Sequence, residues 1–267
     1  HILNNKNILE DVCFPIVEYF IVQRFPFESI GCFTASNLGF CNSPIREMTY
    51  EEGDLMKYYN KEAHIKYDGK GNICSHLHDL LYHCPKCNHE FEMVGDGNVI
   101  KCLNCDNGAE MDDYYDFHPF EGSIIPRDPA RWHDEERKLV YHEIKDNPDF
   151  EFVEKVKVGY LPPYHSPKNK ATSEICGEGI MKFNHEGIFF EGTKLGEPFS
   201  FKLDYETYNT LVITVDCTYF AFYINGEYFD FFPERPVVGK LLLIVEEMHR
   251  LHGGKWKNLP QLNWVYE

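Results

Sequence analysis

The segment CPKCNHEFEMVGDGNVIKCLNC, residues 84–105, contains two C-x-x-C pairs with 14 residues between them. Each pair can present two thiolates from one tight turn, and four thiolates in a tetrahedron are a ligand set that structural zinc prefers. The stretch between the pairs is typical of two short strands joined by Gly-Asp-Gly-Asn. The spacing therefore predicts a zinc ribbon at residues 76–120, with Zn²⁺ as the cofactor. The predicted metal ligands are Cys84, Cys87, Cys102 and Cys105.

The same four cysteines have two other interpretations. They can be two redox-active pairs, or four buried free thiols. The paired spacing favours the metal site, in a reducing compartment rather than in a disulfide framework, so we expect a cytoplasmic protein. His83 and His89 flank the first pair, but four cysteines already complete a tetrahedron. Asn88 and Asp106 directly follow the two pairs and tolerate the left-handed backbone that such turns require.

Charge and hydropathy limit the classes of partner. The 267-residue chain has a formal net charge of −17, and residues 84–115 carry seven acidic residues against two lysines. Nucleic-acid binding needs clustered basic residues, so we expect no nucleic-acid partner and a structural role for the ribbon. The longest apolar stretch, residues 12–22, has 11 residues and includes a proline and a glutamate. A membrane helix needs about 20 apolar residues, so we expect no transmembrane segment.

From residue 150 onward the hydrophobic pattern changes to a period of two. Asn225-Gly226 is a strong type I′ hairpin signal, because both residues tolerate positive φ. After the last strand the pattern changes to a period of 3.6, with Pro236 suited to the start of a helix and Gly253-Gly254 to its end. Seven strands are predicted, at 152–161, 178–183, 187–192, 199–203, 210–215, 219–224 and 227–232.

These patterns predict an α+β fold that is mainly β. Seven antiparallel strands followed by one amphipathic helix resemble the element order of a pleckstrin-homology-like or GRAM-like barrel, in which the helix plugs one open end. The predicted order is a helical or irregular segment at 1–75, the ribbon at 76–120, a linker helix at 121–149, the helix-capped seven-stranded barrel at 150–254 and an aromatic tail at 255–267.

Several short sequence motifs around the predicted ribbon occur in a particular order. They are Met-Thr-Tyr-Glu-Glu at 48–52, Ile-Lys-Tyr-Asp-Gly-Lys at 65–70, Leu-Leu-Tyr-His-Cys-Pro-Lys-Cys at 80–87, the second cysteine pair, Tyr-Asp-Phe at 115–117, a helix with Trp132 and a glycine-rich stretch at 177–192. In this order they resemble the C-terminal extension of bacterial lysophospholipid acyltransferases that act on 1-acyl-glycerol-3-phosphate. The resemblance covers roughly residues 45–250 and implies a role in phospholipid biosynthesis.

The resemblance implies a non-catalytic region. The catalytic unit of that family is H-x-x-x-x-D, and no histidine of this chain has an aspartate five positions later; His64 and His142 miss by one residue. Only 83 residues precede the first cysteine pair, too few for the catalytic domain, and the chain begins at His1 without a methionine. We therefore expect a fragment of a larger enzyme, or a relative that has lost the N-terminal catalytic domain, with no catalytic residue in this chain.

The stretch FFEGTKLG at 189–196 is close to F-P-E-G-T-R, with which these acyltransferases hold the glycerol phosphate of their acceptor. Phe190 replaces the proline, Lys194 replaces the arginine, and no catalytic pair precedes it. Lysine and arginine also grip phosphate differently. We therefore predict that this stretch is a β-hairpin.

Two other functions remain open. One is a free-standing module that binds an acyltransferase domain or another protein, with peripheral membrane contact as a further option. The other is an enzyme with an unrecognised site in residues 1–80, where His64, Cys32 or Cys41 would line a pocket. Lys168 and Lys170 lie in a predicted loop that offers a weaker candidate site for an anion.

Overall fold

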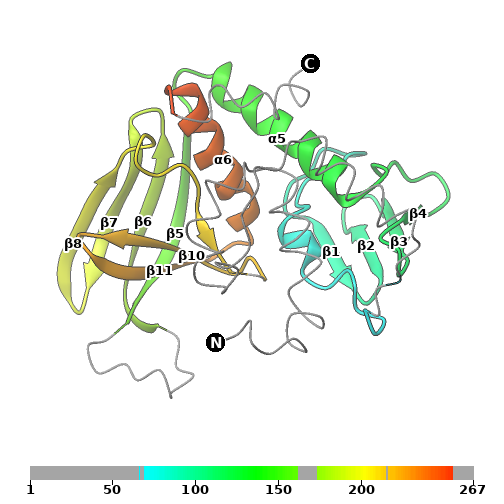
Figure 1. Cartoon of the computed structure of the whole chain (residues 1–267), viewed down its shortest axis with the longest axis horizontal. Helices are drawn as coiled ribbons and strands as arrows, with labels where there is room; N and C mark the ends of the chain where they lie inside the picture. The colour runs from blue at the N-terminus through cyan, green and yellow to red at the C-terminus, as the bar shows by residue number, and fades with distance from the viewer. Residues whose placement is uncertain (1–65, 67–68, 162–172, 215, 255–267) are drawn as a thin grey trace, which may run out of the picture. The chain divides into compact units, whose positions relative to one another are not determined.

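The computed structural model describes residue 66 and residues 69–161, 173–214 and 216–254 (Figure 1). From residue 69 on, these residues belong to one compact unit, Gly69–Leu259. They form two antiparallel sheets and two α-helices, so the mainly β composition is confirmed. The aromatic tail at 255–267 and most of the segment at 1–75 lie outside the described residues.

The first sheet carries the two cysteine pairs. Its order is β1-β2-β3-β4, from β1 (Met93–Asp96), β2 (Val99–Cys102), β3 (Gly108–Met111) and β4 (Phe117–Pro119), and the 3₁₀ helix η3 (Leu77–Asp79) precedes it. The two strands expected between the cysteine pairs are β1 and β2, which turn at Gly97 with φ 58°. Met93, Ile100, Ala109 and Met111 are buried on this sheet and form its small core.

Helix α5 (Pro129–Lys145) closes the core of the first sheet. Its start follows the usual chemistry: Asp128 caps the helix by accepting the Arg131 N–H, and Pro129 needs no hydrogen bond at the first position. Trp132 is buried in the core of the first sheet, edge-on to Phe117 with ring centroids 5.9 Å apart. The predicted linker helix is therefore packed into the core of the first sheet.

The second sheet contains all seven predicted strands. They are β5 (Glu151–Tyr160), β6 (Glu174–Asn184), β7 (Gly187–Lys194), β8 (Glu197–Leu203), β9 (Val212–Ile213), β10 (Phe220–Ile224) and β11 (Glu227–Pro233). Asn225 and Gly226, with φ 53° and 83°, form the predicted turn between β10 and β11.

The prediction of a closed barrel is wrong. The strand order is β8-β7-β6-β5-β11-β10-β9, so the first strand pairs with the last, while β8 and β9 are free edges. Closure would require β8 to pair with β9. Strand β9 has only two residues, Val212 and Ile213, and both are paired with β10. The sheet therefore stays open on this side.

The open sheet is nevertheless strongly curled around an aromatic core. Three strands lie between Phe199 of β8 and Phe229 of β11 in the sheet order, yet their ring centroids are 5.3 Å apart. Phe190 of β7 and Phe231 of β11, both fully buried, also contact one another, at 5.7 Å. Apolar burial by these rings is the main stabilisation of this sheet.

Helix α6 (Val238–Leu251) follows the second sheet and lies beside α5 (Figure 1). A single apolar face was predicted, but every residue from 238 to 249 is buried, including Lys240, Glu246 and Glu247. The polar residues are buried because each one forms an ion pair. Gly253, with φ 88°, follows the helix as predicted.

Candidate metal centre

The backbone of the first sheet forms two matching turns around the cysteine pairs. In the first, the Cys84 N–H donates to the His89 carbonyl and the Asn88 N–H donates to the Cys84 carbonyl, each at 2.9 Å. In the second, the Cys102 N–H and the Asp106 N–H make equivalent bonds, at 2.8 and 3.0 Å. The left-handed backbone predicted at Asn88 and Asp106 is confirmed, with φ 60° and 55°.

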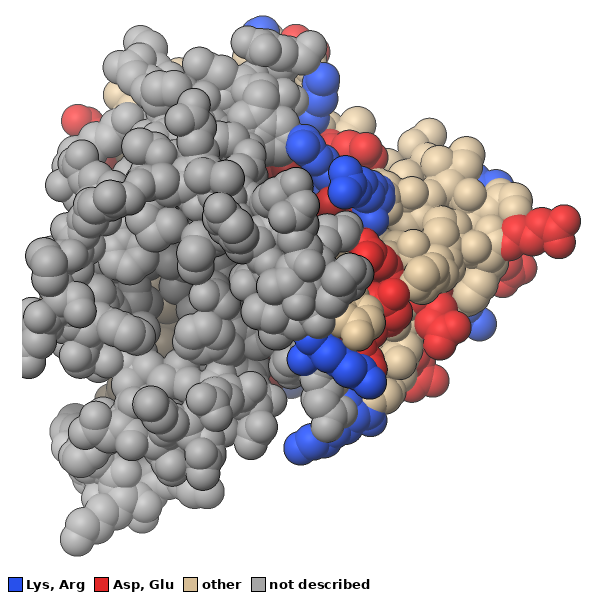
Figure 2. All heavy atoms as spheres, turned by 45° about the vertical axis from the view of Figure 1, so that its right-hand side comes forward, with Lys and Arg blue, Asp and Glu red and all other residues tan. Residues whose placement is uncertain are grey.

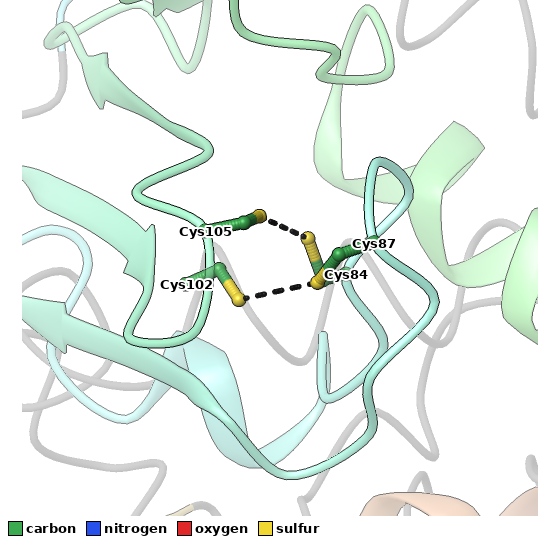
Figure 3. Close-up of side chains that lie close together, drawn as sticks. All are labelled: Cys84, Cys87, Cys102 and Cys105. Atoms are coloured by element: carbon green, nitrogen blue, oxygen red, sulfur yellow. Dashed lines mark hydrogen bonds between the residues drawn. The ribbon is translucent and has the colours of Figure 1, made fainter.

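These turns bring the four cysteine sulfurs together. The Sγ atoms of Cys84 and Cys105 are 3.6 Å apart, those of Cys87 and Cys102 are 3.7 Å apart, and all four lie within 4.8 Å of one another (Figure 3). Zn–S bonds of about 2.3 Å in a tetrahedron place neighbouring sulfurs about 3.8 Å apart. The predicted residues thus converge, and their number, type and spacing fit a tetrahedral thiolate site. Within the described ranges, no other cluster of three such side chains could hold a metal.

Asn107 is a residue of this centre that the sequence did not single out as a contact. Its side chain is fully buried, and its Nδ2 lies 3.6 Å from the Cys84 Sγ, where it donates a hydrogen bond. The same amide donates to the Ile124 carbonyl at 2.8 Å and accepts the Ile124 N–H at 2.7 Å. Asn107 therefore links the two cysteine turns to the chain that leads into α5.

The thiols of the cluster have unlike electrostatic environments. The backbone N–H of His89 lowers the pKa of Cys87 to about 5, whereas burial raises the pKa of Cys102 to about 12. A bound divalent cation favours deprotonation of every coordinating thiol. A bound cation would therefore favour the thiolate form of all four cysteines, although the pKa values of Cys87 and Cys102 differ widely without it.

Neither flanking histidine belongs to the cluster. The His89 Nδ1 lies 3.2 Å from the Cys87 carbonyl and 3.3 Å from the Asn104 amide, on the exposed side of the turn. His83 is half-buried, and burial lowers its pKa below the ordinary value. The four cysteines alone form the candidate ligand set.

Two residues of α5 hold the backbone of His83, the residue just before Cys84. The His83 N–H donates to the Glu136 Oε1 and the Trp132 Nε1–H donates to the His83 carbonyl, both at 2.9 Å. Sequence reasoning did not assign either side chain to the site, because nothing in the local pattern tells which residue 49 or 53 positions away will meet His83.

The stretch resembling the glycerol-phosphate motif is a hairpin, as predicted. Strand β7 ends at Lys194, Leu195 and Gly196 form the turn, and β8 follows. The Lys194 ammonium lies 2.5 Å from a Glu227 carboxylate oxygen and 4.7 Å from the centre of the Phe229 ring. Lys194 is thus paired within the sheet.

Among the described residues, the other candidates give no second site. His142 and Asp146, the near miss of the catalytic pair, form an exposed contact of 3.3 Å one turn apart at the end of α5. His64, Cys32, Cys41, Lys168 and Lys170 lie outside the described residues. No described helix has both the length and the apolar character that a membrane span requires.

No protein family, curated protein or solved structure matches this chain.

Proposed function

We propose that this chain is a non-catalytic accessory module built around a structural zinc site. The observation that carries the proposal is the convergence of four cysteine sulfurs at nearly tetrahedral spacing. Zn²⁺ bound there would cross-link the two turns of a segment whose core is small. Four protein ligands leave no open coordination position for a substrate or an activated water, which favours a structural role over a catalytic one.

The second sheet supports a docking role. Seven antiparallel strands followed by one C-terminal helix have the element order of pleckstrin-homology-like domains, with the sheet open between β8 and β9. We propose that the sheet and the zinc ribbon together form a rigid adaptor in the cytoplasm. Its partner would be a lysophospholipid acyltransferase domain, which it docks or orients near the lipid substrate. The order of sequence words from 48 to 192 supports this partner.

A free-standing protein-interaction module is the second candidate. Exposed apolar side chains on the ribbon region favour it, because such residues commonly form protein contacts. Leu103 and Ile124 are each 58% exposed, and Phe120 is 40% exposed. Leu103 lies inside the second cysteine turn, so a partner bound here would sit beside the metal centre.

Metal content tests the first part of the proposal. The purified full chain should contain one zinc ion per molecule, as measured by inductively coupled plasma mass spectrometry. Its Co²⁺ form should show the intense absorption of a tetrahedral thiolate site. Cys84→Ser and Cys102→Ser should lose this signal. Cys176→Ser, at a half-buried cysteine of β6 outside the cluster, is the matched control and should keep it. A chain that purifies and refolds with no zinc would refute the proposal.

Activity and binding assays test the second part. The zinc-loaded chain should not acylate lysophosphatidate, but it should bind a separately purified acyltransferase domain in a titration calorimetry experiment. Acylation by the chain alone would contradict the non-catalytic assignment. Binding to unrelated proteins and not to the acyltransferase domain would favour the free-standing module.

A further inference from the structure

Helix α5 contacts the metal centre through the backbone of one residue, His83. The amide of His83 and its carbonyl are bonded to Glu136 and Trp132, which lie one helical turn apart. Both α5 side chains are 1% exposed, so neither bond has water as a ready substitute. Cys84 directly follows His83 in the chain. The position of the first ligand is therefore fixed by a helix that contributes no ligand.

Helix α5 is in turn tied to α6 by buried charges. The Arg137 guanidinium pairs with Glu247 at 2.9 Å and also with Glu246, and all three side chains are at most 3% exposed. A buried charge that loses its partner is strongly destabilising, so these ion pairs favour movement of the two helices together.

A second route joins α6 to the first cysteine turn. The Lys240 ammonium, 4% exposed, lies 2.8 Å from Glu90 and 2.9 Å from Glu143 of α5. Glu90 is three residues beyond Cys87, directly after the first turn. One lysine of α6 therefore binds the metal-bearing segment and α5 simultaneously.

We infer that Trp132 and Glu136 are positioning residues of the metal centre, and that Zn²⁺ binding is thermodynamically linked to docking of the α5–α6 pair. The inference rests on the proposed zinc site and deepens it. Linkage is reciprocal: if docked α5 holds Cys84 in its ligand position, bound zinc must hold α5 in its docked position by the same free energy.

Metal loss has a specific expected consequence. Without the cation, the two cysteine turns are no longer held together, and the backbone of His83 beside the first turn is less constrained. The hydrogen bonds of Glu136 and Trp132 with His83 then break part of the time, which destabilises the docked position of α5. The centre of the second sheet has its own aromatic core, so β6, β7 and β8 should be insensitive.

Zinc affinity tests the positioning role. In full-length protein, chelator competition should show binding about 10–100-fold weaker for Trp132→Phe, which removes the indole N–H and keeps a smaller aromatic ring. Glu136→Ala should weaken binding similarly, and Glu136→Gln, which keeps an acceptor oxygen, should restore part of the affinity. Glu135→Ala is the matched control, since Glu135 is its exposed neighbour on the same helix. Unchanged affinity in both Trp132→Phe and Glu136→Ala would overturn the inference.

Hydrogen exchange on the wild-type chain tests the linkage without any variant. Zinc removal should accelerate exchange in peptides from 129–145 and 238–251 and leave peptides from 174–203 unchanged. If zinc binds but its removal alters only the ribbon, the inference fails while the zinc site stands. Acceleration throughout the unit would also contradict it, because that is global unfolding. A wild-type chain that binds no zinc would instead refute the proposed function itself.

Discussion

Asn107 shows how much one side chain can contribute to a site without being a ligand. Its amide reaches the Cys84 sulfur and both backbone groups of Ile124. The Asn107 side chain is fully buried, and a buried polar group that loses its partner costs about 1–3 kcal/mol. Asn107 is therefore an outer-shell residue that holds the first cysteine turn against the chain entering α5.

We predict that Asn107→Ala lowers the free energy of unfolding of the zinc-loaded protein by about 1–3 kcal/mol, because it removes the hydrogen bonds of a fully buried amide to the Cys84 sulfur and to the Ile124 backbone. Urea unfolding followed by circular dichroism measures this. Lys101→Ala is the control: Lys101 is an exposed residue of β2, so a change within about 0.5 kcal/mol is expected. Equal effects of the two substitutions would contradict the role assigned to Asn107.

A second residue-scale prediction concerns His252, just after α6. Its Nε2 lies 3.2 Å from the His185 Nδ1, and burial, with a smaller effect from His185, lowers the pKa of His252 below its ordinary value of 6.5. A lowered pKa means that the folded state binds the proton less readily than the unfolded state. The stability contributed by neutral His252 is thus complete above pH 6.5 and is lost as the pH falls through the lowered pKa.

His252→Gln should therefore reduce the loss of thermal stability between about pH 7.5 and pH 5. Melting temperatures of wild type and variant, measured across this range with zinc present, provide the comparison. An identical pH dependence for the two proteins would show that the contact between His185 and His252 carries no measurable linkage.

At the residue scale, the sequence predicts the clustered cysteines better than the residues that position them. The four cysteines and the left-handed positions Asn88 and Asp106 follow from local spacing and local backbone preference. Trp132 and Glu136 act across about 50 positions of sequence, where no periodicity or spacing rule reaches. Contacts at such range depend on how elements pack, which a single sequence does not reveal.

At the scale of elements, α6 is a helix whose surroundings decide its composition. Lys240, Glu246 and Glu247 interrupt its apolar pattern, and each one meets an opposite charge from another element. Gly239 has a different reason: a Cβ at this position would lie 2.4 Å from the Asp79 carbonyl oxygen. At this position α6 approaches η3 closely, through its only glycine.

Gly239→Ala sets two effects against each other. Alanine favours a helix by about 1 kcal/mol relative to glycine. Overpacking against backbone, which cannot rotate away as a side chain can, costs about 1–3 kcal/mol. We predict net destabilisation of up to about 2 kcal/mol in thermal or urea unfolding, together with faster exchange of the Asp79–Leu80 amides. Net stabilisation would show that α6 can shift away from η3 freely.

Strand prediction and sheet closure illustrate different kinds of information. Alternation of side chains within each strand is local, so all seven strands were found near their observed bounds. Closure depends on which strands meet. The pairing of β5 with β11 and the shortness of β9 leave the sheet open, and neither is written in the alternation of one segment. Element existence was therefore predictable, and the arrangement was only partly so.

At the scale of the whole molecule, acidic residues outnumber basic ones by 43 to 26, and several of the described basic side chains form ion pairs with glutamates. Lys155, Lys194 and Lys240 each lie within 3.0 Å of a glutamate oxygen. On the face shown in Figure 2, the visible basic side chains lie beside acidic ones and do not gather into one broad patch. Together with the formal net charge of −17, this leaves little free positive surface in the described region for a polyanion.

The charge distribution predicts that the zinc-loaded chain binds neither duplex DNA nor vesicles rich in phosphatidylserine at about 150 mM salt. Polyanion binding draws its free energy from counterion release by clustered lysines and arginines, and here the nearby carboxylates cancel that gain. Fluorescence anisotropy with labelled DNA and vesicle co-sedimentation measure the two cases, with a basic DNA-binding protein as the positive control. Binding that weakens steeply as salt rises would contradict the prediction, because it would require a positive surface strong enough to overcome the net charge of the chain.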